Sequence, residues 1–189
     1  MIHEISHGLM ALAWGDKTAQ YEGRLTLNPI KHLDWFGSII LPFFLYISGA
    51  GFMIGWAKPV PYNPYNLKNR KIAEPLVAFA GPLSNFFIAL VFGIIVRSLV
   101  YFGLYENLVI ILSFVVLLNI SLAIFNLIPI PPLDGSKILS AFLPVGTKYA
   151  YSSIANKYGL FIIIAIVFFL PNFISPIIYK IFTLITGLV

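Results

Sequence analysis

Residues 1–14 read MIHEISHGLMALAW, which sets an H-E-x-x-H pattern, His3 to His7, in apolar sequence. On an α-helix, positions i and i+4 lie on the same face, so His3 and His7 can offer two imidazoles to one metal ion. Glu4 sits beside the first histidine and can act as a general base on water at that ion. A polar helix start whose histidines are capped or solvated is the alternative. The stretch predicts a metal-dependent hydrolytic site.

The rest of the chain has the composition of a membrane protein. Hydrophobic residues make up 59% of the 189 residues and charged residues only 10%, whereas about a quarter of the residues of a soluble domain are charged. We expect an all-α polytopic membrane protein, one bundle of about five to six transmembrane helices. The chain has no cysteine, so any metal must be bound by nitrogen and oxygen ligands. The net charge of +5 is attributed to basic cytoplasmic loops, and we expect no nucleic-acid binding.

Long apolar segments predict the positions of the helices. Spanning helices are expected over 36–56, 75–103 and 108–128, a short helix over 134–143, and a C-terminal helical hairpin or one broken helix over 148–189.

The first helix, over 1–14, is too short to span a membrane. A helix that begins at membrane depth leaves its first N–H groups unpaired in lipid, so we expect residues to be missing before Met1. Residues 17–35 follow, with a turn at Glu22-Gly23 and partial alternation of apolar residues. This pattern fits a short re-entrant hairpin and a plain surface loop equally well. His32, near the end of this segment, is interpreted as a loop or interface residue and not as a ligand.

Asp134 is the remaining carboxylate in strongly apolar sequence and is the natural third ligand. Two histidines and one carboxylate, with a fourth position open for water, are typical of catalytic zinc, whereas structural zinc sites are usually closed by four protein ligands. The rival role for Asp134 is that of N-cap to the helix that follows it. We predict one Zn²⁺ per chain, bound by His3, His7 and Asp134.

Three asparagines lie at membrane depth in the predicted helices, where polar groups are costly and often functional. Asn85, Asn119 and Asn126 are candidates to line a channel that brings water or substrate to the metal. For Asn85, a hydrogen bond between packed helices explains the residue equally well.

The basic residues predict the orientation in the membrane. If successive helices cross alternately, loops 57–74 and 130–157 share one side and carry seven lysines and arginines, while loop 15–35 and turn 104–107 share the other and carry three. Lysine and arginine are enriched in cytoplasmic loops. The first side, and the metal near Asp134, are therefore expected at the cytoplasmic face.

Three motifs occur in a fixed order: His3-Glu4-x-x-His7, Gly81-Pro82-x-x-Asn85 and Asn126-x-x-Pro129-x-x-x-x-Asp134-Gly135. With the stretches 22–29 and 55–60, they resemble the site-2 protease family of intramembrane zinc metalloproteases, peptidase family M50, in its small bacterial and archaeal branch.

The resemblance implies zinc held by His3, His7 and Asp134, with Glu4 as catalytic base and acid. It also implies a multi-pass protein of a prokaryotic cell membrane that cuts membrane-spanning protein substrates in regulated intramembrane proteolysis. Two alternatives stay open: an inactive relative that binds membrane segments, and a small transporter or channel subunit.

Overall fold

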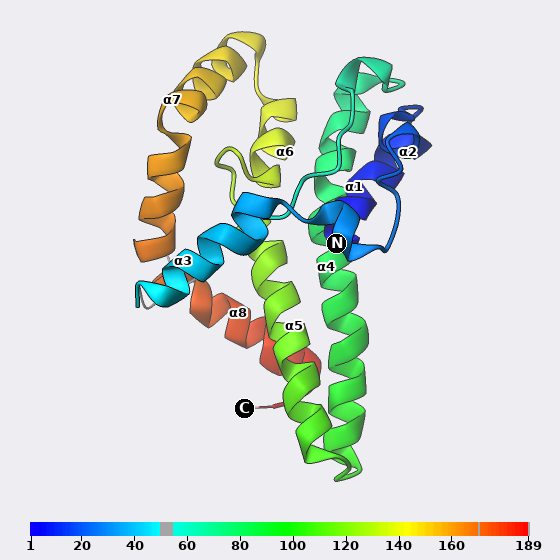
Figure 1. The fold of residues 1–189 in the computed structure, drawn as a ribbon, viewed down its shortest axis with the longest axis vertical. Helices are drawn as coiled ribbons and strands as arrows, with labels where there is room; N and C mark the ends of the chain where they lie inside the picture. Colours follow the sequence, from blue (N-terminus) through cyan, green and yellow to red (C-terminus); the bar gives the residue numbers. More distant parts are fainter. Residues whose placement is uncertain (50–54, 170, 189) are drawn as a thin grey trace.

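The computed structural model describes residues 1–49, 55–169 and 171–188, and this part of the chain contains helices and loops but no strand (Figure 1). The predicted all-α class is confirmed. The α-helices are α1 (Ile2–Ala13), α2 (Thr18–Tyr21), α3 (Leu41–Ile47), α4 (Arg70–Tyr101), α5 (Glu106–Asn126), α6 (Asp134–Phe142), α7 (Val145–Phe169) and α8 (Pro171–Thr186). Short 3-10 turns occupy Pro29–His32 and Pro64–Asn66, and a π-helical turn occupies Trp35–Ile40.

Helices α4 and α5 form an antiparallel pair, and α1, α6 and α8 pack against it (Figure 1). Among the described residues, these two are the helices that are long and apolar enough to cross a membrane; five to six such spans are not found. Their interface buries one small residue, which lets the helices approach closely there, and three β-branched residues. The buried residues are Ala89, Val96, Val116 and Ile120, and α8 packs against the same cluster.

Helix α1 lies antiparallel along the first half of α4. Ala11 of α1 shares a buried cluster with Ala73 and Val77 of α4. The carbonyl oxygen of Trp14, just after α1, accepts a hydrogen bond of 2.8 Å from the Lys68 amide, just before α4. The end of α1 is therefore level with the start of α4, and the two histidines, nearer the start of α1, lie deeper along α4.

The predicted spanning helix over 36–56 is wrong. The helical residues of this region, Trp35–Ile47, end early, and Gly55 and Trp56 are not helical, while residues 50–54 lie outside the described part. Thirteen helical residues extend about 20 Å, short of the ~30 Å hydrocarbon core of a bilayer. The Trp56 amide donates to the carbonyl oxygen of Gly37 at 3.1 Å, so the segment returns to the place where it began.

The segment over 17–35 is a loop with short helical turns, which agrees with the surface-loop alternative; the re-entrant hairpin that fitted its sequence equally well is not found in these residues. Its anchor is Arg24, a buried residue whose guanidinium donates to the carbonyl oxygens of Lys31, Lys58 and Pro59. The Lys58 amide in turn donates to the His32 carbonyl oxygen at 2.9 Å. Without strands to pair its backbone, this loop uses one arginine and the neighbouring segment for its hydrogen bonds.

These contacts correct the predicted arrangement of loops. Loops 15–35 and 57–74 were expected on opposite sides, but they are hydrogen-bonded to each other and lie at the same end of α4. The prediction failed because it counted residues 36–56 as a crossing. With the loops together, ten of the twelve lysines and arginines belong to segments 15–35, 57–74 and 130–157.

The remaining predicted helices are found with shifted ends. Helix α4 begins before the predicted 75–103 segment and α5 occupies most of 108–128. Helix α6 begins at Asp134, and the C-terminal region forms two helices, α7 and α8, with residue 170 between them outside the described part. Gly135 lets α6 begin tightly against the end of α5, since a Cβ there would collide with the carbonyl oxygen of Leu127.

Candidate metal centre

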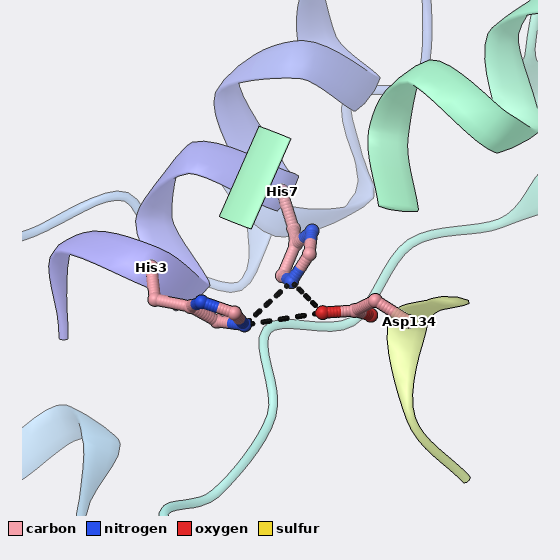
Figure 2. A group of neighbouring side chains, drawn as sticks. All are labelled: His3, His7 and Asp134. Carbon is pink, nitrogen blue, oxygen red and sulfur yellow. Dashed lines mark hydrogen bonds and ion pairs between the residues drawn. The ribbon is translucent and has the colours of Figure 1, made fainter. Parts of the chain in front are cut away.

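Side chains from two helices far apart in the sequence converge on one point (Figure 2). His3 and His7 project from the same face of α1, as the i, i+4 spacing requires, and Asp134 reaches them from the first residue of α6. The Nε2 atoms of the two histidines are 3.1 Å apart, and each is 3.2 Å from Oδ2 of Asp134. The structure thus brings together the three residues that the sequence singled out as ligands.

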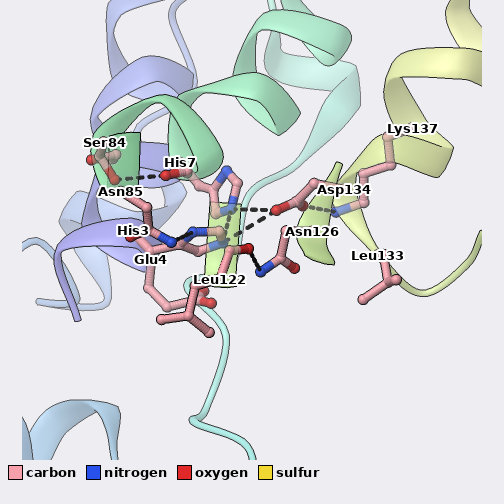
Figure 3. A network of polar contacts seen from close by, with 12 residues as sticks. His3, Glu4, His7, Ser84, Asn85, Leu122, Asn126, Leu133, Asp134 and Lys137 are labelled. Carbon is pink, nitrogen blue, oxygen red and sulfur yellow. Dashed lines mark hydrogen bonds and ion pairs between the residues drawn. The ribbon is translucent and has the colours of Figure 1, made fainter. Parts of the chain in front are cut away.

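Both imidazoles are oriented by contacts with α4 through their other ring nitrogens. His7 Nδ1 lies 2.7 Å from the carbonyl oxygen of Val77, an acceptor that places the proton on Nδ1 and leaves the Nε2 lone pair free. His3 Nδ1 lies 3.1 Å from the side-chain amide of Asn85, which is buried. Both Nε2 atoms are therefore directed toward Asp134, as a shared ligand requires (Figure 3).

The triangle of ligand atoms matches the chemistry and size of a zinc site. Two histidines and a carboxylate form the donor set of many catalytic zinc sites, and bonds of about 2.0–2.1 Å in a tetrahedron place neighbouring ligand atoms about 3.3–3.4 Å apart. The observed separations are 3.1–3.2 Å. Two imidazole lone pairs and a carboxylate oxygen repel one another unless a metal ion or a proton lies between them. The three residues therefore fit Zn²⁺.

Glu4 borders the same centre. Its carboxylate lines a cavity of about 170 Å³ together with the three ligand residues. Oε2 of Glu4 accepts a hydrogen bond of 3.1 Å from the amide of Val60, which fixes the direction of the carboxylate. Val60 belongs to the segment 56–62, an extended strap of chain that crosses the cavity and contributes Pro59 and Tyr62 to its wall. A cavity of this size has room for water beside Glu4.

Asp134 does not act as an N-cap, the rival role considered for it. Leu133 occupies the capping position of α6, and the Asp134 carboxylate turns toward the histidines. Its second oxygen, Oδ1, lies 4.0 Å from Nζ of Lys137, which also lies 5.4 Å from the centre of the Tyr62 ring. Lys137 thus adds a positive charge beside the ligand carboxylate.

Tyr62 stays a neutral hydrogen-bonding group at this site. Burial raises the pKa of its hydroxyl to about 12, and the carboxylates of Glu74 and Asp134 act in the same direction. A protonated hydroxyl next to the cavity can donate a hydrogen bond to a carbonyl group.

The three predicted channel residues have different surroundings. Asn126 lines the cavity, although its amide nitrogen also donates to the Leu122 carbonyl oxygen of its own helix. Asn119 donates to the Val115 carbonyl oxygen one turn back in α5 and is not among the residues that line this cavity. Asn85 contacts His3. Their predicted role as channel lining stays a prediction.

His32 is buried in the loop, where its Nε2 lies 2.8 Å from the Thr26 carbonyl oxygen, and it is no part of the ligand group. Val60 and Arg24 could not be singled out from the sequence, because both act through backbone groups. Lys137 was also missed, although its position three residues after Asp134, on the same helix face, gave a signal.

Comparison with known proteins agrees with this geometry. The chain is 39% identical over 180 residues to "Putative zinc metalloprotease YwhC" of Bacillus subtilis, an alignment that covers 90% of the chain and 76% of that relative.

The chain belongs to peptidase family M50. The model of that family matches residues 104–170, the part that contains Asp134. Two further relatives are named in the same way: Rip2 of Mycolicibacterium smegmatis, 28% identical over 87% of the chain and 61% of its own length, and MJ0611 of Methanocaldococcus jannaschii, 35% identical over 74% and 63%. The chain thus spans about three quarters of YwhC but less than two thirds of the other two. No solved structure matches it.

Family and relatives identify this M50 chain as a zinc metalloprotease, a hydrolase of the site-2 protease type, whose cofactor is Zn²⁺. The family consists of membrane proteases, in keeping with the two long apolar helices.

Proposed function

We propose that this chain hydrolyses peptide bonds of membrane-spanning proteins within the bilayer, in regulated intramembrane proteolysis, with His3, His7 and Asp134 as zinc ligands and Glu4 as catalytic base. The observation that carries the proposal is the convergence of the three ligand atoms on a cavity that the Glu4 carboxylate also lines. A carboxylate beside a two-histidine, one-carboxylate zinc site is the arrangement of metal-assisted hydrolysis.

The depth of the centre supports cleavage inside the membrane. From Pro75 to Val96, α4 carries no charged residue, and these 22 residues extend about 33 Å, enough for the hydrocarbon core. Gly81, which faces both histidines, is six residues from the start of this apolar stretch, about 9 Å along the helix. A multi-pass bundle of about five to six spans in a prokaryotic cell membrane belongs to the same proposal.

The distribution of basic residues supports a cytoplasmic position for the centre. Ten of the twelve lysines and arginines belong to segments 15–35, 57–74 and 130–157, and two of these segments are hydrogen-bonded to each other at the beginning of α4. Because lysine and arginine are enriched on the cytoplasmic side, this end of α4 is assigned to the cytoplasm, and the metal centre lies close to it.

The residues of the chain divide the chemistry among them. A bound zinc ion supplies Lewis-acid chemistry, polarising the scissile carbonyl and acidifying water. Glu4 takes the proton of the attacking water and returns it to the leaving amine, and the Val60 amide holds its carboxylate in place for both transfers. A substrate helix must unwind first, because its backbone groups are already hydrogen-bonded within the helix. We therefore expect helix-weakening residues near the bond that is cut.

The test compares purified wild-type chain with Glu4→Gln on candidate single-span substrates in proteoliposomes, with zinc content measured on the same samples. The variant should retain about one zinc per chain and lose at least about 100-fold in cleavage rate, the lower end of the effect of a general base. His3→Ala and Asp134→Ala should lose the zinc and the activity together.

Glu22→Gln is the matched control, because Glu22 is exposed and lies outside the cavity. It should cleave at the wild-type rate. Cleavage by Glu4→Gln at that rate would remove Glu4 from the mechanism. A cellular effect that persists in Glu4→Gln would favour the non-cleaving relative.

A further inference from the structure

A second cavity lies apart from the metal centre, between the beginning of α4, the end of α6 and the beginning of α7. Its volume is about 700 Å³, within the range of sites for small ligands. These three helix ends lie at the same end of the molecule, as Figure 1 shows. None of the residues that line this cavity also lines the cavity of the metal centre.

The wall of this second cavity is basic. Arg70, Lys71 and Lys148 line it, against the single carboxylate of Glu74. That carboxylate is already engaged, since its Oε2 lies 3.3 Å from Nε of Arg70. Among the described residues, Lys71 and Lys148 form no ion pair. The cavity therefore holds an excess of positive charge.

Neutral donors complete the wall. Ser152 and Tyr149 contribute hydroxyl groups to it, while the hydroxyl of Ser140, also in the wall, already donates to the Lys137 carbonyl oxygen at 2.9 Å. Helix α4, which begins at Arg70, has no side-chain cap, so its first amide groups add a partial positive charge at the same place. Three cations, hydroxyl groups and an uncapped helix start together favour a phosphate-bearing ligand.

An apolar groove adjoins the basic cavity. Its volume is about 540 Å³, and Ile72, Leu76 and Phe79 of α4 face Ile138 and Phe142 of α6 across it. Lys71 and Ala141 belong to both walls, so the groove and the cavity meet. A ligand that fills both must be anionic at one end and apolar at the other.

The position of the pair relative to the membrane identifies that ligand. Helix α4 has 32 residues, or about 48 Å, against a hydrocarbon core of about 30 Å. Arg70, Lys71 and Glu74 precede the uncharged stretch that begins at Pro75, so the basic cavity lies at the level of the lipid headgroups and the groove lies at the level of the acyl chains.

We propose that the cavity and groove bind one anionic phospholipid, its phosphate against Arg70, Lys71 and Lys148 and an acyl chain between α4 and α6. Basic pockets beside membrane helices on the cytoplasmic side bind such headgroups. The site goes beyond the catalytic mechanism. It rests on the proposed function only for the position of α4 in the membrane. Because α6 carries Asp134 and α4 carries the contacts to both histidines, the lipid would join the two helices that hold the metal centre together.

The test is a titration of the purified chain in neutral detergent with phosphatidylglycerol or phosphatidylcholine, with bound lipid counted by native mass spectrometry. One phosphatidylglycerol should bind at least about tenfold more tightly than phosphatidylcholine. In Lys71→Gln/Lys148→Gln, the dissociation constant for phosphatidylglycerol should rise roughly 25-fold, because each basic residue near the membrane surface contributes about fivefold to the affinity. Lys71→Arg/Lys148→Arg should bind phosphatidylglycerol as the wild type does. Such binding would show that changes at these two positions permit folding.

The control pair is Lys17→Gln/Lys31→Gln, which removes the same charge from two exposed lysines outside the cavity and should leave binding unchanged. Equal binding of the two lipids, or equal weakening by the two glutamine pairs, would overturn the proposal. So would the loss of bound phosphatidylglycerol in a tenfold excess of inorganic phosphate, because a soluble anion would then be the occupant. Leu76 lines the groove but not the basic cavity. Loss of phosphatidylglycerol binding in Leu76→Ser would therefore support the acyl-chain part of the site.

Discussion

The Nδ1 atom of His7 lies 2.7 Å from the carbonyl oxygen of Val77, seventy residues further along the chain. This contact ties α1 to α4 and points the other ring nitrogen at Asp134. Gly81, one turn after Val77, leaves the space in which the imidazole lies. The metal centre therefore depends on the close packing of two helices as much as on its ligands.

Gly81→Ala should weaken zinc binding. A Cβ at this position would collide with Nε2 of His7 and lie 2.7 Å from Cε1 of His3, so both ligands must shift. Overpacking of this kind costs about 1–3 kcal/mol, and we expect zinc affinity, measured by competition with a chelator, to fall at least fivefold. Gly146→Ala, where a Cβ meets nothing within 4 Å, should bind zinc as the wild type does. Equal zinc affinity in the two variants would show that α1 can move away from α4 at little cost.

Asn85 should act on zinc through His3. In the structure, Nδ2 of Asn85 lies 3.1 Å from Nδ1 of His3. When Nε2 of His3 binds metal, Nδ1 carries the proton and needs an acceptor, so the Asn85 amide must rotate to present its oxygen in place of its nitrogen. Asn85→Leu removes the acceptor and should lower zinc affinity about 10- to 100-fold, as loss of such an orienting partner does. Asn85→Asp keeps an oxygen at this place and should retain the zinc. If the aspartate variant loses as much zinc as the leucine variant, the contact with Nδ1 is not what orients His3.

The sequence predicted the convergence of His3, His7 and Asp134 because each carries chemistry that is costly in apolar surroundings unless it is used. It did not predict the return of the chain after α3. Hydropathy shows that residues 36–56 are apolar, but not whether they cross the membrane or turn back. The turn depends on two hydrogen bonds, one from the Trp56 amide to the Gly37 carbonyl oxygen and one from the Ser38 hydroxyl to the Trp56 carbonyl oxygen. The predicted arrangement of the loops was wrong for the same reason.

The contacts of Arg24 were equally hidden, because its partners are carbonyl oxygens, which every residue possesses. Asn85 could be singled out as a polar group at membrane depth, but its partner could not, since only the packing of α1 on α4 brings His3 to it. What the sequence shows is which side chains need partners; which backbone groups supply them depends on the fold.

Arg24→Met should impair catalysis more than zinc binding. The Arg24 guanidinium donates to the carbonyl oxygens of Lys58 and Pro59, at 2.9 and 3.0 Å, and the next residue, Val60, donates to Glu4. Without Arg24 these two carbonyl groups lose a charged donor, and the strap no longer holds the Glu4 carboxylate. We expect kcat to fall about tenfold with zinc content unchanged.

Arg24→Lys should restore only part of kcat, because one ammonium group cannot reproduce the fork of donors. Arg97→Met is the control, since Arg97 also donates to a carbonyl oxygen, that of Leu184, but at the far end of α4. Loss of zinc in parallel with activity in Arg24→Met would mean that Arg24 supports the whole site and does not act through Glu4.

Asp16 should make the stability of the chain depend on acidity. Its carboxylate is buried at the end of α1 and accepts hydrogen bonds from the Thr18 amide and hydroxyl, the Asn63 amide and the Asn66 side chain, at 2.6–3.1 Å. Burial alone would raise the pKa of this carboxyl group, but the four hydrogen bonds to its charged form outweigh burial and lower the pKa below its ordinary value of 3.8. The ionised form therefore stabilises the fold.

Because the folded pKa of Asp16 is the lower one, its contribution is complete above the unfolded value and is lost as the pH falls through the folded value. Asp16→Asn keeps one acceptor oxygen but loses the charge, and it should lower the free energy of unfolding by about 1–3 kcal/mol at pH 7. Thermal unfolding in detergent, followed from pH 7 down to pH 3, should show the gap between wild type and variant narrowing below about pH 4. Glu22→Gln, at an exposed carboxylate, should follow the wild type throughout. A gap that stays constant down to pH 3 would mean that the loss in Asp16→Asn comes from shape and not from the charge of the carboxylate.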